Sequence, residues 1–264
     1  MGRKLTDLLC RFYLAIIMIF LYVPILVMVV LSFNSSRSRV VWEGFTLSWY
    51  ARLFSSKQIL GALATTLEVA LLSAAISLVI GTLAALGISA MRRREYTITM
   101  ALTNIPMLNA DIVTGIALML WFIHFMPLSF NTVLIAHITF NIPYVILAVL
   151  PKVQQMNISI YEASRDLGAN AVYGFFTMLL PQLTGGLVAG FFMAFTLSMD
   201  DFVITYFTKG AGFNTLTTMI YGEIRKGIKP EMYALSTMIF VTVFAILLAV
   251  NVLRGKEEKD EAYY

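Results

Sequence analysis

The sequence predicts an all-helical integral membrane protein with six transmembrane helices. Of its 264 residues, 59% are hydrophobic and 13% are charged, and the mean hydropathy is +0.81. A soluble domain could not bury this much apolar surface. Three runs without a charged residue, 12–36, 69–91 and 232–253, contain 25, 23 and 22 residues. About 20 residues cross the hydrocarbon core as a helix, and continuous runs argue against the alternating strands of a membrane β-barrel.

The expected spans follow the chain in order and make up one helical membrane domain with short flanks. They are 12–33, 60–91, 97–122, 131–151, 182–207 and 232–253. Residues 1–33 comprise a cytoplasmic tail and the first span, and 34–59 an external segment whose Trp and Tyr side chains suit the membrane interface or an external partner. The five later spans form a core domain, 60–253, because no loop is long enough for a soluble domain. A charged tail, 254–264, follows.

The composition of the second span is typical of a helix inside a bundle. It contains Gly61, Gly81 and Gly87 together with many Ala and Ser residues. Small residues let helices approach closely in lipid, where packing replaces the hydrophobic drive for association. We therefore expect this span to pack against other helices of the chain.

Clustered arginines indicate how the spans are oriented. Arg92–Arg94 directly follow the second span, and cytoplasmic loops carry an excess of Lys and Arg near span ends. With an even number of spans, both termini then face the cytoplasm together with residues 92–96 and 152–181. The formal net charge of +4 follows from this orientation, so we expect membrane lipid and not nucleic acid as the surroundings of these basic residues.

The chain lacks the residue sets of nucleotide hydrolysis and of metal catalysis. It has no G-x-x-x-x-G-K-[ST] loop and no H-E-x-x-H motif, and its one cysteine, Cys10, cannot form an intramolecular disulfide. His124 and His137 lie on different segments, which favours hydrogen-bonded structural roles over a metal pair. We expect no catalytic residue and no metal site, and a membrane-embedded enzyme is the weakest alternative.

The loop 152–181 contains a polar stretch, YEASRDLGANAVYGFFTMLLPQ at 161–182, within an otherwise apolar chain. Ser159 and Glu162 are spaced as a capping box, which predicts a helix from Ile160. Gly168 can supply the left-handed residue that ends it, and Asn170 can cap a second helix that leads into the fifth span. A two-turn helix is unstable alone in water, so it either packs on the bundle or is presented to a soluble partner.

The spacing of this loop resembles that of a known family. The letters E-A-S at 162–164 are followed after three residues by Gly168, and after nine more by M-L-L-P at 178–181. This is similar to the E-A-A, three positions, G, nine positions, I-x-L-P loop of permease subunits in type I binding-protein-dependent ABC importers. A serine replaces the second alanine, and a methionine replaces the isoleucine.

The resemblance covers about residues 60–250 and implies both a fold and a set of partners. The implied fold is the type I ABC importer permease fold, in which the short cytoplasmic helix, the coupling helix, docks on an ATP-hydrolysing subunit. The docking positions so implied are Glu162, Ala163, Ser164 and Gly168. The implied partners are ATPase subunits that hold ATP and Mg²⁺, a homologous permease and an external binding protein, in the bacterial inner membrane.

Four acidic residues within the expected spans are candidates for a transport pathway: Glu68, Asp111, Asp200 and Asp201. A charged side chain at the centre of a bilayer costs about 2.5–3.5 kcal/mol on insertion scales, so its presence suggests a function. No Lys or Arg lies inside the same spans away from their ends, which makes a bound cation an attractive partner. Glu68 is expected near an interface, in a structural role.

Helical spacing narrows this choice. Two polar stripes are expected, one on the third span and one on the fifth: Asn104, Asp111 and Thr114, and Ser198, Asp201, Thr205 and Thr208. Asp200 and Asp201 are ~100° apart on a helix, and Asp201 is favoured because it lies on its stripe. The alternative is that these aspartates bond to hydroxyls of neighbouring helices or cap a helix break.

Unpaired acidic residues together with Trp121, which can make cation–π contacts, suit a polycationic substrate. The residues alone indicate only a cation. The whole chain, including S-M-D-D-F-V-I-T at 198–205, resembles permeases of bacterial spermidine/putrescine importers within the family, which implies a polyamine. The other hypothesis is a secondary transporter of a small organic cation, driven by protons through the aspartates.

Overall fold

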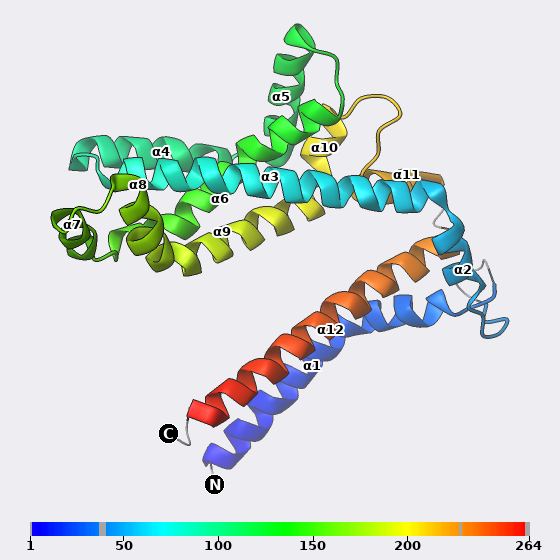
Figure 1. Cartoon of the computed structure of the whole chain (residues 1–264). Coiled ribbons are helices and arrows are strands. Elements are labelled where there is room, and N and C mark those ends of the chain that lie inside the picture. Colours follow the sequence, from blue (N-terminus) through cyan, green and yellow to red (C-terminus); the bar gives the residue numbers. More distant parts are fainter. Residues whose placement is uncertain (1, 37–40, 227–228, 262–264) are drawn as a thin grey trace. The chain divides into compact units, whose positions relative to one another are not determined.

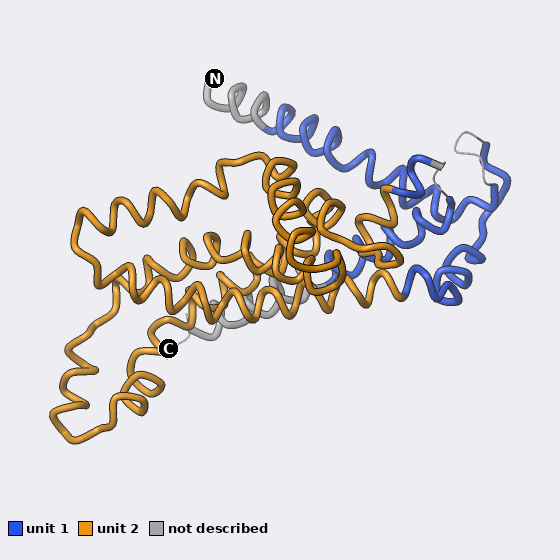
Figure 2. Tube along the Cα trace, turned by 90° about the horizontal axis from the view of Figure 1, so that it is seen from above, with its two compact units in different colours: residues 1–60, 222–264 blue, residues 61–221 orange. Residues whose placement is uncertain are grey.

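The computed structural model describes the backbone of residues 2–36, 41–226 and 229–261, and the side chains of 11–36, 41–225 and 229–245. The chain divides into two compact units, residues 1–60 with 222–264 and residues 61–221 (Figure 2). The side chains of the expected tail, 254–264, and of Cys10 lie outside the described residues.

The first unit pairs the two ends of the chain. Its helices are α1 (Gly2–Ser32), α2 (Ser48–Ser55) and α12 (Pro230–Glu261), and both α1 and α2 pack on α12 (Figure 1). The apolar part of α1, Arg11–Leu31, is unburied, as suits a lipid-facing helix. In the expected interfacial segment, the buried Trp49 donates from Nε1 to the carbonyl of Asn34 at 2.7 Å, and Arg52 lies over its ring.

The second unit contains the central helices and the loop with the polar stretch. Its elements are α3 (Lys57–Ser89), α4 (Arg93–Leu108), α5 (Asp111–Phe125), α6 (Phe130–Gln154), α7 (Ile158–Asp166), α8 (Ala171–Gly174), a π-helical turn (Phe175–Leu179), α9 (Leu180–Asp200), α10 (Val203–Thr208) and the start of α11 (Leu216–Lys226). Its core is formed by buried side chains of α3, α6 and α9, and α6 and α9 pack along their length (Figure 1).

Small residues bring these helices together, as the composition of the second span predicts. A Cβ at Gly81 of α3 would lie 2.6 Å from Val145 Cγ1 on α6, so the helices touch there without a side chain between them. A Cβ at Gly190 of α9 would lie 3.5 Å from the same Val145 atom. Gly61 and Gly87 face open space and do not take part in this contact.

The expected third span, 97–122, is wrong as a continuous helix. It consists of α4 and α5, which are bent by 99° at a break. Asn109 and Ala110 have extended backbones, and Pro106 already weakens the end of α4 because it lacks an N–H. Asp111 then falls in the first turn of α5, where an acidic group is favourable. The stripe expected from Asn104 to Thr114 is therefore interrupted.

The fifth span also breaks, near its expected end at 207. A nearly continuous helical stretch runs from Ala171 to Asp200, but Asp201 is extended, with φ −62° and ψ 125°, and α10 begins only at Val203. The expected stripe from Ser198 to Thr208 is thus divided between two helices.

The number of spans is smaller in the described residues than the six expected. Four helices there are long and apolar enough to cross a membrane, or five if the bent pair α4 and α5 forms one span. The sixth expected span, 232–253, corresponds to α12, whose described side chains form a shorter apolar helix, Pro230–Ala245.

Candidate functional site

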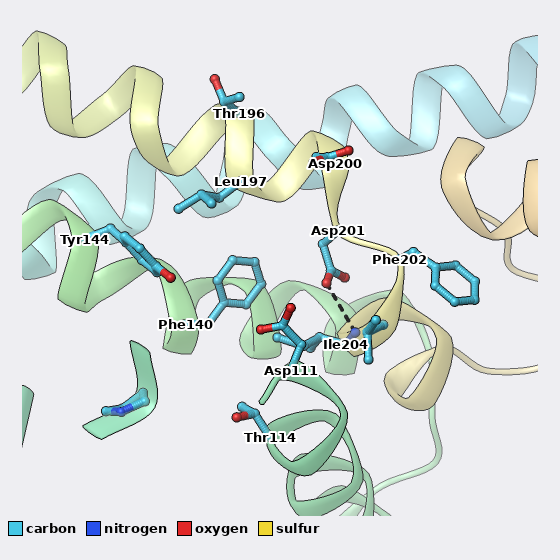
Figure 3. A pocket seen from close by; sticks show the side chains of 12 residues that line it. Asp111, Thr114, Phe140, Tyr144, Thr196, Leu197, Asp200, Asp201, Phe202 and Ile204 are labelled. Atoms are coloured by element: carbon cyan, nitrogen blue, oxygen red, sulfur yellow. Dashed lines mark hydrogen bonds between the residues drawn. The ribbon is translucent and has the colours of Figure 1, made fainter. Parts of the chain in front are cut away.

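The two helix breaks meet at a cavity of about 310 Å³ in the second unit (Figure 3). Its walls come from the end of α4, the start of α5, the middle of α6 and the α9–α10 break. The polar and aromatic side chains that line it are Asp111, Thr114, Phe140, Tyr144, Thr196, Asp200, Asp201 and Phe202. Its volume lies at the lower end of the range of small-molecule sites.

Asp111 and Asp200 present unpaired carboxylates to this cavity. Both side chains are exposed, and neither forms a hydrogen bond or an ion pair with another described residue. Asp111 projects from the first turn of α5, and Asp200 is the last residue of α9. The breaks therefore bring together two acidic groups that lie far apart in the sequence, and both remain free to bind a cation.

Asp201 is bonded within the fold, which fits the alternative that it caps a helix break. Its Oδ1 accepts the backbone N–H of Ile204 at 3.2 Å (dashed in Figure 3), and its Oδ2 accepts the N–H and the hydroxyl of Thr205, each at 2.7 Å. Its own carbonyl accepts the Thr217 hydroxyl at 2.8 Å. Asp201 thus starts α10 and ties the break to α11.

His137 completes this arrangement, and the sequence did not associate it with the site. The ring is 1% exposed; its Nε2 lies 2.9 Å from Thr205 Oγ1 and 3.5 Å from Asp201 Oδ2. The prediction that His137 is hydrogen-bonded is confirmed. A signal was present, because His137, Asn141 and Tyr144 are spaced four and three residues apart and so share one face of α6.

A second polar cluster lies one turn further along α6. The buried Asn141 donates from Nδ2 to Ser198 Oγ of α9 at 2.8 Å, and Ser198 Oγ lies 2.8 Å from Ser73 Oγ of α3. These contacts join three helices just before the α9–α10 break. They fix the end of α9, from which Asp200 projects.

The cavity is lined by aromatic residues other than Trp121, which the sequence analysis favoured. Phe140 and Tyr144 of α6 line the cavity together with the acidic residues, and the ring of Phe202, the third aromatic residue there, points away from them (Figure 3). Trp121 is 64% exposed on α5, where its ring packs against Phe125, and it does not line the cavity. Phe140 and Tyr144 are therefore the side chains placed for cation–π or apolar contacts with a bound cation.

The loop 152–181 forms the two short helices that the sequence predicts, with a different first cap. Asn157, and not Ser159, caps α7: its Oδ1 accepts the N–H of Ser159 at 3.1 Å, and the helix starts at Ile158. The predicted capping box with Glu162 is wrong, because Asn157 satisfies the first turn two residues earlier. Gly168 ends the helix with φ +90°, and Asn170 caps α8, both as predicted.

One face of α7 is held by α8. A Cβ at Gly174 would lie 3.0 Å from the Tyr161 ring and 3.2 Å from Ser164 Oγ, so a larger residue there would force these side chains of α7 to shift. Asn157 N donates to Gln182 Oε1 at 3.0 Å, which anchors the start of α7 to α9. The loop is a braced projection at the end of α6 and α9 opposite α5 and α10 (Figure 1).

The other face of α7 is open. Glu162 and Ala163 are exposed, and the apolar Ile160 and Leu167 are 46% and 91% exposed. The sequence predicted an apolar stripe at Ile160, Ala163 and Leu167, and the whole stripe points away from the chain. Ser164 lies on the braced face, where its hydroxyl donates to the carbonyl of Tyr161 at 2.7 Å.

Comparison with known proteins gives one family and several relatives of nearly full length. Residues 77–255 match the model of the binding-protein-dependent transport system inner membrane component. The spermidine/putrescine transport system permease protein PotC of Escherichia coli (strain K12) is 32% identical over 248 residues, 94% of each chain. The putrescine transport system permease protein PotI of the same strain is 32% identical, covering 91% of this chain and 89% of PotI.

Solved structures share the fold at lower sequence identity. A chain from a bacterial ABC transporter involved in the import of the acidic polysaccharide alginate aligns with a TM-score of 0.72 at 14% identity, covering 96% of both chains. A chain from an amino acid ABC transporter aligns with a TM-score of 0.52 at 16% identity, covering 80% of this chain and all of that one.

Proposed function

This chain belongs to the family of binding-protein-dependent transport system inner membrane components, and from that membership we propose that it carries polyamines into the cytoplasm. Members of this family are non-catalytic permease subunits of ATP-driven importers, which operate with ATPase subunits, a substrate-binding protein and a second permease. A self-sufficient proton-driven transporter is not favoured, because the relatives are ABC importer permeases.

The observation that carries the choice of substrate is the acidic cavity. Asp111 and Asp200 are unpaired, and Asp201, which follows Asp200 at the α9–α10 break, lines the same cavity. A polyamine carries several ammonium groups joined by methylene chains, so it pairs with carboxylates while Phe140 and Tyr144 contact the methylenes. The relatives named for spermidine and putrescine transport support this choice.

The proposed pathway consists of Asp111, Asp200 and Asp201. Carboxylates buried in a membrane without basic partners are costly, and a passing cation offsets that cost. Trp121 belongs to the pathway only where a second permease encloses the exposed face of α5, since it lies outside the cavity of this chain.

The proposed contact with the ATPase is the open face of α7. Glu162 and Ala163 are exposed there, and Leu167 is almost fully exposed. Ser164 and Gly168 support the shape of α7 and do not contact the ATPase directly, because Ser164 packs near α8 and Gly168 ends the helix. A helix braced on one side transmits a push from the ATPase to α9, and so to the α9–α10 break.

The proposed orientation places both termini and α7 in the cytoplasm. Gln154 Nε2 at the end of α6 donates to the Tyr96 hydroxyl at 3.2 Å, so the Arg92–Arg94 cluster and the α7 loop lie at one end of the second unit. The positive-inside rule assigns this end to the cytoplasm. We retain 60–253 as the core domain, after the 1–33 and 34–59 segments and before the tail 254–264.

The function is tested with the complete transporter reconstituted in liposomes that enclose ATP. We expect uptake of labelled spermidine that unlabelled putrescine reduces, while histidine and alginate oligosaccharides do not. Uptake of histidine or of an acidic sugar in preference to polyamines would contradict the proposal.

A further inference from the structure

The buried imidazole of His137 is a titratable group next to the cavity to which the proposed function assigns no role. It is 1% exposed, and its Nδ1 has no hydrogen-bond partner among the described residues. Its nearest polar contact is Thr205 Oγ1, 2.9 Å from Nε2, and Asp201 Oδ2 lies 3.5 Å from the same nitrogen. Both partners belong to the α9–α10 break, so the buried ring is placed to hold that break.

The hydrogen bonds from His137 run in one direction. Thr205 has one hydroxyl hydrogen, and its Oγ1 donates it to Asp201 Oδ2 at 2.7 Å. The Thr205 oxygen must then accept from His137, so Nε2 carries the hydrogen. The chain of donors leads from α6 through Thr205 to the carboxylate at the α9–α10 break.

The short helix α10 depends on such contacts. It has six residues, too few to be stable alone. Two bonds fasten it to α6: His137 holds the first turn through Thr205, and the Thr132 hydroxyl shares its hydrogen between the carbonyl of Thr208, at 2.8 Å, and that of Ser129, at 2.7 Å. The first of these bonds reaches Asp201, and the second does not.

The position of Asp200 follows from this break. Asp200 is the last residue of α9 and directly precedes Asp201, so the bonds that hold Asp201 also set the position of Asp200, which lines the cavity. Asp111 projects from α5 and forms no hydrogen bond with this network within the described part of the chain.

We propose that His137 is a positioning residue of the transport site: through Thr205 and Asp201 it fixes the α9–α10 break and thereby the direction of Asp200. In this arrangement Asp201 affects substrate binding indirectly, by holding Asp200 in position. Asp111 and Asp200 make the contacts with the cation. The identity of the substrate in this inference rests on the proposed function. The hydrogen-bond network from His137 to Asp201 does not depend on it.

The test compares four variants in the complete transporter. His137→Leu removes the donor, whereas His137→Gln keeps an N–H donor without an imidazole. Asp201→Asn weakens the acceptor. Thr132→Val is the matched control, because it loosens the other end of α10 and has no contact with Asp201. Initial rates of spermidine uptake, taken per assembled complex, give kcat/KM for each variant.

We expect His137→Leu to lower kcat/KM about tenfold, as for a lost bond in a charged network, and His137→Gln to stay within about threefold of the wild type. When His137→Leu is combined with Asp201→Asn or with Asp200→Asn, kcat/KM should fall little below that of the more impaired single variant, since both changes disrupt the same network. Combination with Asp111→Asn should multiply the two losses. Thr132→Val should lower the melting temperature, but its effect on kcat/KM should not be non-additive with Asp201→Asn or Asp200→Asn.

The inference would be overturned if the losses of kcat/KM in His137→Leu and Asp201→Asn multiplied in the double variant. It would also be overturned if His137→Gln were as impaired as His137→Leu. The same double-mutant cycle in thermal unfolding requires no substrate: His137→Leu and Asp201→Asn should be non-additive there as well. If the wild type imports no polyamine, the proposed function fails while this coupling persists. If polyamine import is intact and the coupling is absent, the inference on His137 fails alone.

Discussion

The three aspartates at the cavity have unequal surroundings. Asp111 and Asp200 are exposed and unpaired, while the Asp201 side chain is 8% exposed and accepts three bonds from α10. A carboxylate whose oxygens already accept hydrogen bonds binds a cation less strongly than one whose oxygens are free. Direct contact with substrate is therefore expected from Asp111 and Asp200.

We predict that Asp111→Asn and Asp200→Asn each lower kcat/KM for polyamine uptake about tenfold. A hydrogen bond to a charged group contributes about 1.5–3 kcal/mol, and each 1.4 kcal/mol is a factor of about ten. Glu68→Gln is the control, because Glu68 is exposed on α3 and does not line the cavity. Equal losses in all three variants would show that the effect is general and not due to the cavity.

The sequence identified the acidic residues but not their division of roles. Asp201 was favoured because a continuous helix would place it on a stripe with Thr205. The backbone is extended at Asp201, and that break turns the carboxylate back onto Thr205. Sequence periodicity assumes a regular helix, so it could not show either this cap or the approach of His137 from α6.

Among the elements, α7 combines a braced face with an open one. The tight contact at Gly174 and the bond from Asn157 to Gln182 hold it, and Glu162 faces outward. The pattern of the loop was sufficient to predict both short helices and the turn at Gly168. The position of the first cap could not be predicted, because Asn157 and Ser159 are both good N-cap residues.

We predict that Glu162→Lys and Gly168→Pro abolish transport while the chain still inserts into the membrane. The first reverses a charge on the open face, and the second forbids the φ of +90° that ends α7. Ser159→Ala should have no effect, since Asn157 caps the helix. Uptake and co-purification of the ATPase check this; normal uptake by either main variant would remove α7 from the coupling role.

The contact between α3 and α6 gives a prediction for stability. Gly81→Ala places a methyl group against Val145 and should destabilise the bundle by about 1–3 kcal/mol, the usual cost of overpacking. Gly87→Ala on the same helix meets nothing within 4 Å and should be neutral. Thermal unfolding in detergent distinguishes the two variants. Equal melting temperatures would mean that the helices do not pack through Gly81.

For the whole molecule, composition was sufficient to predict a helical membrane protein, and the loop pattern to predict its family. The continuity of the spans could not be predicted from hydropathy, which does not register the breaks at Asn109 and Asp201. Both breaks lie at the cavity, where irregular backbone is tolerated because it lines a site. The departures from a regular bundle thus coincide with the proposed site of transport.

The central claim is that this chain forms part of an ATP-driven polyamine importer. The most direct measurement is uptake of labelled spermidine into liposomes that contain the complete transporter, with either enclosed ATP or an imposed proton gradient as the energy source. We predict uptake with ATP that persists when the proton gradient is collapsed, and none with the gradient alone. Uptake driven by the proton gradient without ATP would contradict the account.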